Sequence, residues 1–345
     1  MNLEHLKNLA KESFARAVAY IAKSRRRTLI ALGASYLFLF LLFSYLLFPY
    51  GQLKDFALQE FHYPRLPNGE RGRSAYILEV DSLRPHWFTG VKLKNVHFRK
   101  RTTISDQEAS GFSADAVTIH PSILSLLVGK KSASFDVELG DGEIDGSYSG
   151  REEGFSLDAD IDDVDLKELA LIESLIGLPS TGLINGSIEL NVAKEAAENN
   201  GEIELSIEGL SIGDDKAALK IKDVPPGMKL AKIDAGDLEA HVSIENGIGK
   251  IDQFQSSGKD LELQGSGEIR PRFPFNQSAV NALVKFKFND AYKKKNDTNI
   301  GLFMILDNLP QMKRAKTSDG WLQYRLRGNF TRLRPLPDGK ARNPS

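Results

Sequence analysis

The residues whose spacing best fits a known chemistry lie in GLSIG at 209–213, with Ser211 at the centre. Gly-x-Ser-x-Gly is the nucleophile elbow of α/β-hydrolases, in which a strand turns sharply into a helix and exposes the serine. His241 follows in the chain, with Asp234 or Asp237 as the third member of a triad. The residues after Ser211 nevertheless return quickly to strand-like alternation instead of opening a helix. We interpret the match as a coincidence and keep a Ser211 hydrolase only as a third hypothesis.

The acidic run DADIDDVDLKEL, which begins at Asp158, resembles the start of an EF-hand calcium loop. Such a loop needs glycine at its sixth position and glutamate at its twelfth, whereas this run has Asp163 and Leu169 there. A solvated strand face is the preferred interpretation, with a weak calcium site as the alternative. The histidines form no H-x-x-x-H or similar pair, so they predict no metal centre; they are His5, His62, His86, His97, His120 and His241.

Two glycine-containing stretches fail the requirements for nucleotide binding. GDGEIDG at 140–146 has Asp145 where a dinucleotide-binding loop needs its third glycine, and it opens no helix. LLVGKKS has Leu124 in place of the first P-loop glycine and Lys131 where serine or threonine must follow the lysine. The sequence therefore predicts no catalytic, cofactor-binding or metal-binding residues, no cofactor, and no enzymatic activity.

The composition sets further limits. The 345 residues include 45 basic and 46 acidic side chains, so net charge gives no argument for a nucleic-acid partner. The chain has no cysteine, which excludes disulfides and thiolate metal sites. Two stretches, HYPRLPNGERGR at 62–73 and RPHW at 84–87, mix basic and aromatic residues. They could touch lipid headgroups, although ordinary solvated loops explain them equally simply.

The elements that would position any site are mostly strands. In FSLDADID, Phe155, Leu157, Ala159 and Ile161 alternate with polar residues, which is the pattern of a half-buried strand. The same alternation predicts strands at 91–98 (with a slip near Asn95), 187–192, 202–209, 218–224, 239–247, 261–265, 283–288 and 322–330. Short connections between many of them indicate about a dozen or more mostly antiparallel strands. Short apolar helices are expected at 121–129, 165–179 and 299–310.

A degenerate repeat links GEIDGSYSG at 142–150 with GLINGSIEL at 182–190, each preceded by one of the short helices. We expect Ile144 and Ile184 to face the apolar side of the sheet. The second glycine of each repeat, Gly146 or Gly186, is expected at a bulge or bend where the sheet must coil.

One segment indicates a membrane. Thr28 to Phe48 is a run of 21 uncharged, mostly apolar residues, which as a helix would reach roughly 31 Å, the thickness of a bilayer's hydrocarbon core. Residues 1–27 hold seven basic and two acidic residues, so the positive-inside rule places them in the cytoplasm. The run is too long for a signal-peptide core and lacks small residues at a cleavage site, so we expect the anchor to be retained. The predicted order is a cytoplasmic segment 1–27, a transmembrane helix 28–48, an exported β-rich domain 49–337, and a disordered tail 338–345.

Several stretches carry a family resemblance. The anchor ending LLFPYGQLKDFALQEF, the segments IHPSILSLLVGKKSASFDVELGDGEIDGSYSG, LIESLIGLPSTGLINGSIEL and LELQGSGEIRPRF, and the closing RAKTSDGWLQYRLRGNFTRLRPLP resemble type II secretion system protein N (GspN) in its longer β-rich form. The helix–glycine–strand arrangement is also similar to AsmA-like proteins. That resemblance implies a single anchor and an extended, curled, mostly antiparallel sheet, either an apolar groove or a sandwich, as one domain or as two modules of about 49–164 and 165–337.

Two functional hypotheses follow from the anchor and the resemblance. The leading one is a non-enzymatic protein of the bacterial inner membrane, with its N-terminus in the cytoplasm and its bulk in the periplasm. Its partners would be the inner membrane and other type II secretion components. The alternative is an AsmA-like lipid-binding or lipid-transfer protein that holds phospholipid in an apolar β groove.

Overall fold

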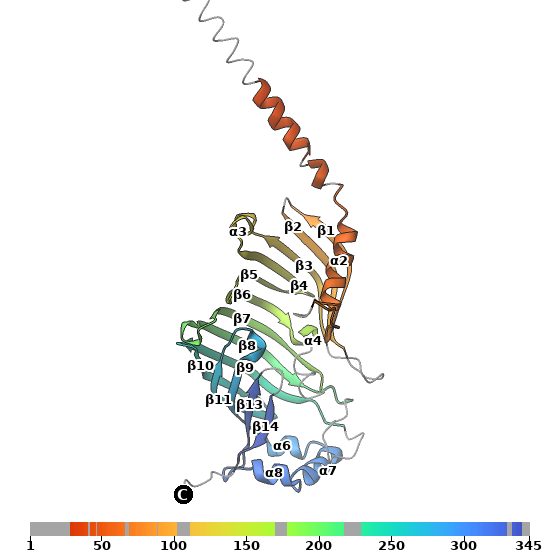
Figure 1. The fold of residues 1–345 in the computed structure, drawn as a ribbon. Coiled ribbons are helices and arrows are strands. Elements are labelled where there is room, and N and C mark those ends of the chain that lie inside the picture. The colour runs from red at the N-terminus through yellow and green to blue at the C-terminus, as the bar shows by residue number, and fades with distance from the viewer. Residues whose placement is uncertain are drawn as a thin grey trace, which may run out of the picture. The chain divides into compact units, whose positions relative to one another are not determined.

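The computed structural model describes residues 28–40, 42–45, 47–65, 69–87, 89–101, 111–169, 178–216, 229–329 and 333–339 (Figure 1). The chain divides into two compact units, Met1–Gln52 and Leu53–Ser345, which are considered separately below. The predicted strand at 218–224 and most of the predicted helix at 165–179 lie outside the described residues.

The first unit contains an apolar helix, Thr28–Tyr45, with a mean hydropathy of 1.9 over its 18 residues and none of that window buried. Its length and composition suffice to cross a membrane. A helix that is apolar on every side and has no protein around it would be unstable in water, because its side chains would remain hydrated.

The second unit is built on one antiparallel sheet of fourteen strands that follow one another in sequence order and do not close into a barrel. This confirms the prediction of a mainly β fold, and the single open sheet replaces the sandwich alternative. The strands are β1 (Tyr76–His86), β2 (Gly90–Lys100), β3 (Gly111–Pro121), β4 (Lys131–Leu139), β5 (Gly142–Arg151), β6 (Gly154–Asp165), β7 (Ser180–Ala193), β8 (Asn200–Ile212), β9 (Ile233–Glu245), β10 (Ile248–Ser257), β11 (Leu261–Arg270), β12 (Ala279–Phe288), β13 (Leu322–Asn329) and β14 (Arg334–Pro337). Because β6 pairs with β7, the sheet runs without interruption through residues 164–165.

The helices are short and lie between strands or before the first one. They are α2 (Tyr50–His62), α3 (Ile123–Leu127), α4 (Leu166–Leu169), α6 (Asp290–Lys293), α7 (Asp297–Leu306) and α8 (Pro310–Ala315), with 3-10 turns η1 (Ala196–Glu198) and η2 (Phe275–Gln277). α7 starts before residue 299 because the Asn296 side chain caps it, accepting a hydrogen bond from Asn299 N. The sequence predicts that a short helix leads directly into the strand that begins at Gly142. This is wrong, because β4 lies between α3 and that strand.

A recurring left-handed residue, which we call the bulge residue, interrupts the alternation along the sheet. Within strands the bulge residues are Asn95 (φ 50°), Asp163 (φ 48°), Gly209 (φ 62°) and Gly236 (φ 69°), and Gly140 (φ 62°) has the same conformation in the turn between β4 and β5. The strand register does not shift at Asn95 or at Gly140. In β6 and β8 the strand register shifts at the bulge residue, between Ile161 and Val164 and between Ile207 and Leu210. Where the register shifts, the extra residue bends the strand and increases its twist, so the sheet coils at β6 and at β8.

Asp and Asn side chains from neighbouring strands stabilise these bulges. The backbone N–H of Gly140 donates to Asp115 Oδ2 at 2.9 Å, that of Asp163 to Asn185 Oδ1 at 2.8 Å, and that of Gly209 to Asp237 Oδ1 at 2.8 Å. Each bond satisfies an amide that the interrupted ladder leaves without a strand partner. The "ING" of the second repeat therefore has a structural role, because its asparagine caps the bulge of the preceding strand.

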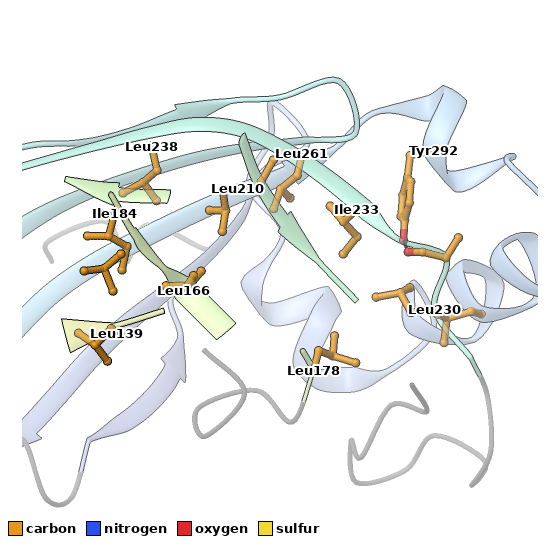
Figure 2. Close-up of a cluster of buried hydrophobic side chains, with 14 of the residues drawn as sticks. Leu139, Leu166, Leu178, Ile184, Leu210, Leu230, Ile233, Leu238, Leu261 and Tyr292 are labelled. Carbon is orange, nitrogen blue, oxygen red and sulfur yellow. Dashed lines mark hydrogen bonds between the residues drawn. The ribbon is translucent and has the colours of Figure 1, made fainter. Parts of the chain in front are cut away.

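The bulges keep apolar residues on one face. On either side of a bulge, apolar residues stand three positions apart and pack in the same core: Leu93 and Val96, Ile161 and Val164, Ile207 and Leu210, Ala235 and Leu238. This core runs from β1 to β11 and takes in Leu166 of α4, Tyr292 of α6, and Leu302 and Phe303 of α7 (Figure 2). A smaller cluster, Leu190, Val242 and Ile244, is packed by further apolar side chains of β6 to β11.

The two isoleucines and Gly186 lie where the sequence predicts, whereas the bulge expected at Gly146 is wrong, because β5 pairs with β4 and β6 there without a register shift. Ile184 is buried and Ile144 packs against the same core. A Cβ at Gly186 would lie 2.1 Å from Glu204 O, and one at Gly146 would lie 2.6 Å from Phe135 Cζ. Both glycines thus permit a close approach that no side chain allows, and Gly186 lies opposite Ile161, at the edge of the β6 bulge.

Both edges of the sheet are protected against further strand pairing. On β1, Lys54 Nζ of α2 donates to Val80 O (3.3 Å) and Asp81 O (3.0 Å), and His62 Nε2 accepts from Leu78 N at 3.1 Å. At the other edge, β14 is short and contains two prolines, which cannot donate to a ladder. Addition of a partner strand to either edge is therefore unfavourable.

The end of the chain is more ordered than the sequence predicts. Asp338, assigned to the disordered tail, forms an ion pair with Arg325 at 2.7 Å, and Gly339 N donates to Arg314 O at 3.0 Å. The remainder of the predicted tail, 340–345, lies outside the described residues.

Candidate functional site

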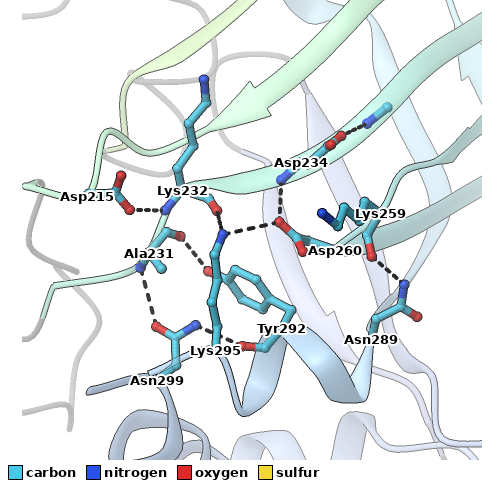
Figure 3. A network of polar contacts seen from close by, with 11 residues as sticks. Asp215, Ala231, Lys232, Asp234, Lys259, Asp260, Asn289, Tyr292, Lys295 and Asn299 are labelled. Atoms are coloured by element: carbon cyan, nitrogen blue, oxygen red, sulfur yellow. Dashed lines mark hydrogen bonds and ion pairs between the residues drawn. The ribbon is translucent and has the colours of Figure 1, made fainter. Parts of the chain in front are cut away.

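A cavity of about 500 Å³ lies where β8, β9 and α6 meet, and we call it the Lys–Asp pocket. Its lining combines alternating charges from segments far apart in the sequence (Figure 3). Its lining includes Ser211, Lys232, Asp234, Asp260, Tyr292 and Lys295.

A buried polar network forms the base of this pocket. Tyr292 is 1% exposed and its hydroxyl donates to Ala231 O at 2.5 Å. Asn299, also fully buried, donates through Nδ2 to Tyr292 O at 3.0 Å and accepts from Ala231 N at 3.4 Å. These bonds fix α6 and α7 to the segment that enters β9, so the base is a structural clamp.

The charged side chains that line the Lys–Asp pocket also bind other groups of the protein. Asp260, 7% exposed, accepts from Asp234 N at 3.0 Å and lies 3.6 Å from Lys295 Nζ. The same ammonium group donates to Lys232 O at 3.0 Å. Burial raises the pKa of the Tyr292 phenol, so it stays a hydrogen-bond donor near neutral pH and cannot serve as a general base. The pocket can accommodate a small charged ligand, but its geometry supplies no acid–base pair.

The structure places Ser211 opposite Asp234 but separates both from His241. Ser211 lies within β8, not at a strand-to-helix turn, and pairs in the ladder with Asp234. His241 instead faces Glu204 across β8 and forms its side-chain hydrogen bond with Glu202 Oε1 at 2.8 Å. Asp237 accepts from Gly209 N as a bulge cap. The hydrolase hypothesis therefore has no assembled site.

Strand pairing does assemble two groups of potential cation ligands that local spacing does not reveal. They are Glu202, Glu204 and His241 on β8 and β9, and Asp136, Glu143 and Asp145 on β4 and β5. In the first group, the hydrogen bond to Glu202 raises the pKa of His241, and the charges of Glu202, Glu204 and Asp252 add to this. In the second, burial raises the pKa of Asp136, followed by repulsion from Asp145. Exposed carboxylates commonly gather without a metal, so these groups define only a strongly acidic region of the polar face.

The acidic run from Asp158 forms strand β6, not a calcium loop. Asp158, Asp160 and Asp162 are exposed on the polar face, while Ala159 is buried on the opposite one. The strand interpretation of this run is confirmed.

The apolar face is the remaining candidate for ligand binding. Its central part is covered by the chain's own α4, α6 and α7. Away from these helices, Leu157, Ile188 and Ile203 are only partly buried around the smaller cluster. Phe155 of β6 reaches Phe275 of η2, with ring centroids 6.1 Å apart, so segments more than a hundred residues apart approach each other here.

No family model matches the chain, and no match was found among curated proteins or solved structures.

Proposed function

We propose that this chain is a non-enzymatic inner-membrane protein whose β-rich body lies in the periplasm and acts through protein contacts in a type II secretion system. The observation that carries the proposal is the combination of one membrane-length apolar helix with an open sheet whose central apolar face is covered by its own helices. The exposed face is then polar and charged, and complementary charges on a protein partner could steer it to this face. We assign the chain to type II secretion because its sequence resembles protein N of that system.

The chain's role is tested by deletion and copurification. A strain lacking the gene should fail to export its type II substrates and should regain export when the full chain is restored. The tagged full chain should copurify with the inner-membrane platform, whereas a tagged unrelated single-span protein should not. Unimpaired secretion in the deletion strain would reject the proposal.

The second candidate, a lipid-binding protein, is favoured by the partly buried apolar side chains around Leu190, Val242 and Ile244. Photo-crosslinking in cells can test it with a matched pair of neighbours on opposite faces of β6. A photoreactive residue at Leu157 should capture phospholipid if the apolar face holds lipid, and one at Asp158 should not. Equal labelling at both positions, or none at Leu157, would reject the candidate.

A further inference from the structure

An exposed apolar surface lies at one end of the first four strands. We call it the tip patch: Trp87 (72% exposed), Ile123 (53%), Leu124 (79%) and Val128 (71%). Trp87 lies in the turn after β1, and the other three lie in and just after α3, between β3 and β4. Isolated exposed apolar residues are ordinary, but four so strongly exposed in two adjacent turns require an explanation.

The two turns are held together by a pair of histidines. His86 Nδ1 and His120 Nε2 lie 3.1 Å apart within hydrogen-bonding distance, and their ring centroids are 5.1 Å apart. Gly90 permits this approach, since a Cβ there would lie 2.5 Å from the His120 ring. Trp87 has a left-handed backbone, φ 52°, next to this contact. The fold therefore fixes the neighbouring turns while leaving the indole exposed.

The charge around the tip patch is positive. Residues 82–98 and 116–135 contain no aspartate or glutamate, whereas Arg84, Lys130 and Lys131 are exposed there. The turn after β5, at the same end of the sheet, holds Glu152 and Glu153, of which Glu153 is paired with Lys194. An exposed tryptophan with aliphatic neighbours and a basic surround is suited to the headgroup region of an anionic bilayer.

The chain's own connections bring such a bilayer within reach. The Lys54 side chain contacts β1 at Asp81, and His62 contacts it at Leu78, so within the second unit α2 lies along β1 with Lys54 nearer than His62 to the Trp87 end of the strand. Lys54 lies only nine positions after Tyr45, the last residue of the apolar helix, and that length of chain can span at most about 30 Å. Trp87 follows Asp81 by six residues, roughly 20 Å along a strand.

We propose that the tip patch docks into the headgroup layer of the same bilayer that Thr28–Tyr45 crosses, with Trp87 as the buried anchor and the lysines on anionic phospholipid. This inference rests on the membrane span in the proposed function. Docking would give the β body a second attachment point and a defined orientation on the membrane surface.

The chain offers an internal control, because its only other tryptophan, Trp321, lies just before β13. The full chain is reconstituted into phosphatidylethanolamine–phosphatidylglycerol vesicles with or without brominated acyl chains. In Trp321→Phe, where Trp87 is the sole tryptophan, we expect brominated lipid to reduce the fluorescence. In Trp87→Phe, where Trp321 remains, we expect little quenching.

A second variant tests whether the lysines beside the tip patch contribute to docking on anionic lipid. Lys130→Glu combined with Lys131→Glu in the Trp321→Phe background should lose much of the quenching in phosphatidylglycerol vesicles, because both charges would then repel the surface. Retention of the protein in vesicles after an alkaline wash reports the membrane span separately. If the protein is retained but Trp87 fluorescence is quenched no more than Trp321 fluorescence, the proposed docking is wrong. It is also wrong if Trp87 becomes buried only when other secretion proteins are added.

Discussion

At the scale of single residues, the polar face gathers carboxylates that come from distant parts of the sequence. His241 lies among these carboxylates, and its pKa is raised, first by its hydrogen bond to Glu202. A histidine whose pKa is higher in the folded state stabilises that state fully below its unfolded pKa. This contribution is lost as the pH rises through the folded value.

We therefore predict that the stability of the protein falls as the pH rises above the ordinary histidine pKa of about 6.5 and that His241→Gln removes part of this fall. Urea unfolding of both proteins at pH values below and above that pKa measures it. Gln253→Ala, which removes a neighbouring side chain bonded to Glu239, serves as the control and should keep the wild-type slope. Identical slopes for wild type and His241→Gln would contradict the assignment.

At the same scale, the close packing around Gly186 of the second repeat can be tested by substitution. Gly186→Ala would place a Cβ 2.1 Å from Glu204 O, so we expect a loss of about 1 to 3 kcal/mol of unfolding free energy. Gly301→Ala is the matched control, since nothing lies within 4 Å of its Cβ and it is helical. That variant should be neutral or gain up to about 1 kcal/mol. Similar effects of the two variants on thermal unfolding would show that close packing at Gly186 is not the cause.

At the scale of elements, the bulge residues explain how one sheet can coil at β6 and at β8 while keeping one apolar face. Glycine occupies three of the five positions, and Asn95 and Asp163 occupy the others. The left-handed conformation is accessible to glycine and, at a modest cost, to asparagine and aspartate. β-branched residues are strongly disfavoured there.

Substitution of Asp163 tests this element. Asp163→Gly should be tolerated because φ is 48°, whereas Asp163→Val should cost about 1 to 3 kcal/mol. Asp162→Val on the same strand, exposed and outside the left-handed region, is the control and should have little effect. Equal stability of Asp163→Gly and Asp163→Val in urea unfolding would refute a left-handed requirement.

The sequence predicts most of this sheet because alternation is a local signal. It identifies β2, β5 to β9, β11, β12 and β13 in whole or in part, and the slip it shows near Asn95 is a residue with a left-handed backbone. It misses β1, β3, β4, β10 and β14. The alternation is weak in β1, which ends in Arg-Pro-His, and in β10, which has a register shift near Ile251. The short helices α6 and α8 are missed because each is a turn or two set by tertiary contacts such as that of Tyr292.

The candidate sites are harder to predict. The Lys–Asp pocket joins Ser211, Asp234, Asp260 and Lys295, and only strand pairing and the buried Tyr292 contact bring these together. The histidine–glutamate group on β8 and β9 has the same origin. Motif searches along the chain test spacing within one segment, so they find Ser211 and His241 as a triad that the fold does not assemble.

At the scale of the whole molecule, the account depends on a retained membrane span with the β body on the far side of the bilayer. The most direct measurement fuses alkaline phosphatase or green fluorescent protein to Ser345 of the full chain in a two-membrane bacterium. We predict an active phosphatase, a dark fluorescent protein, and a full-length product in the membrane fraction that resists alkaline extraction. A fluorescent C-terminal fusion, or a shortened soluble product, would contradict the account.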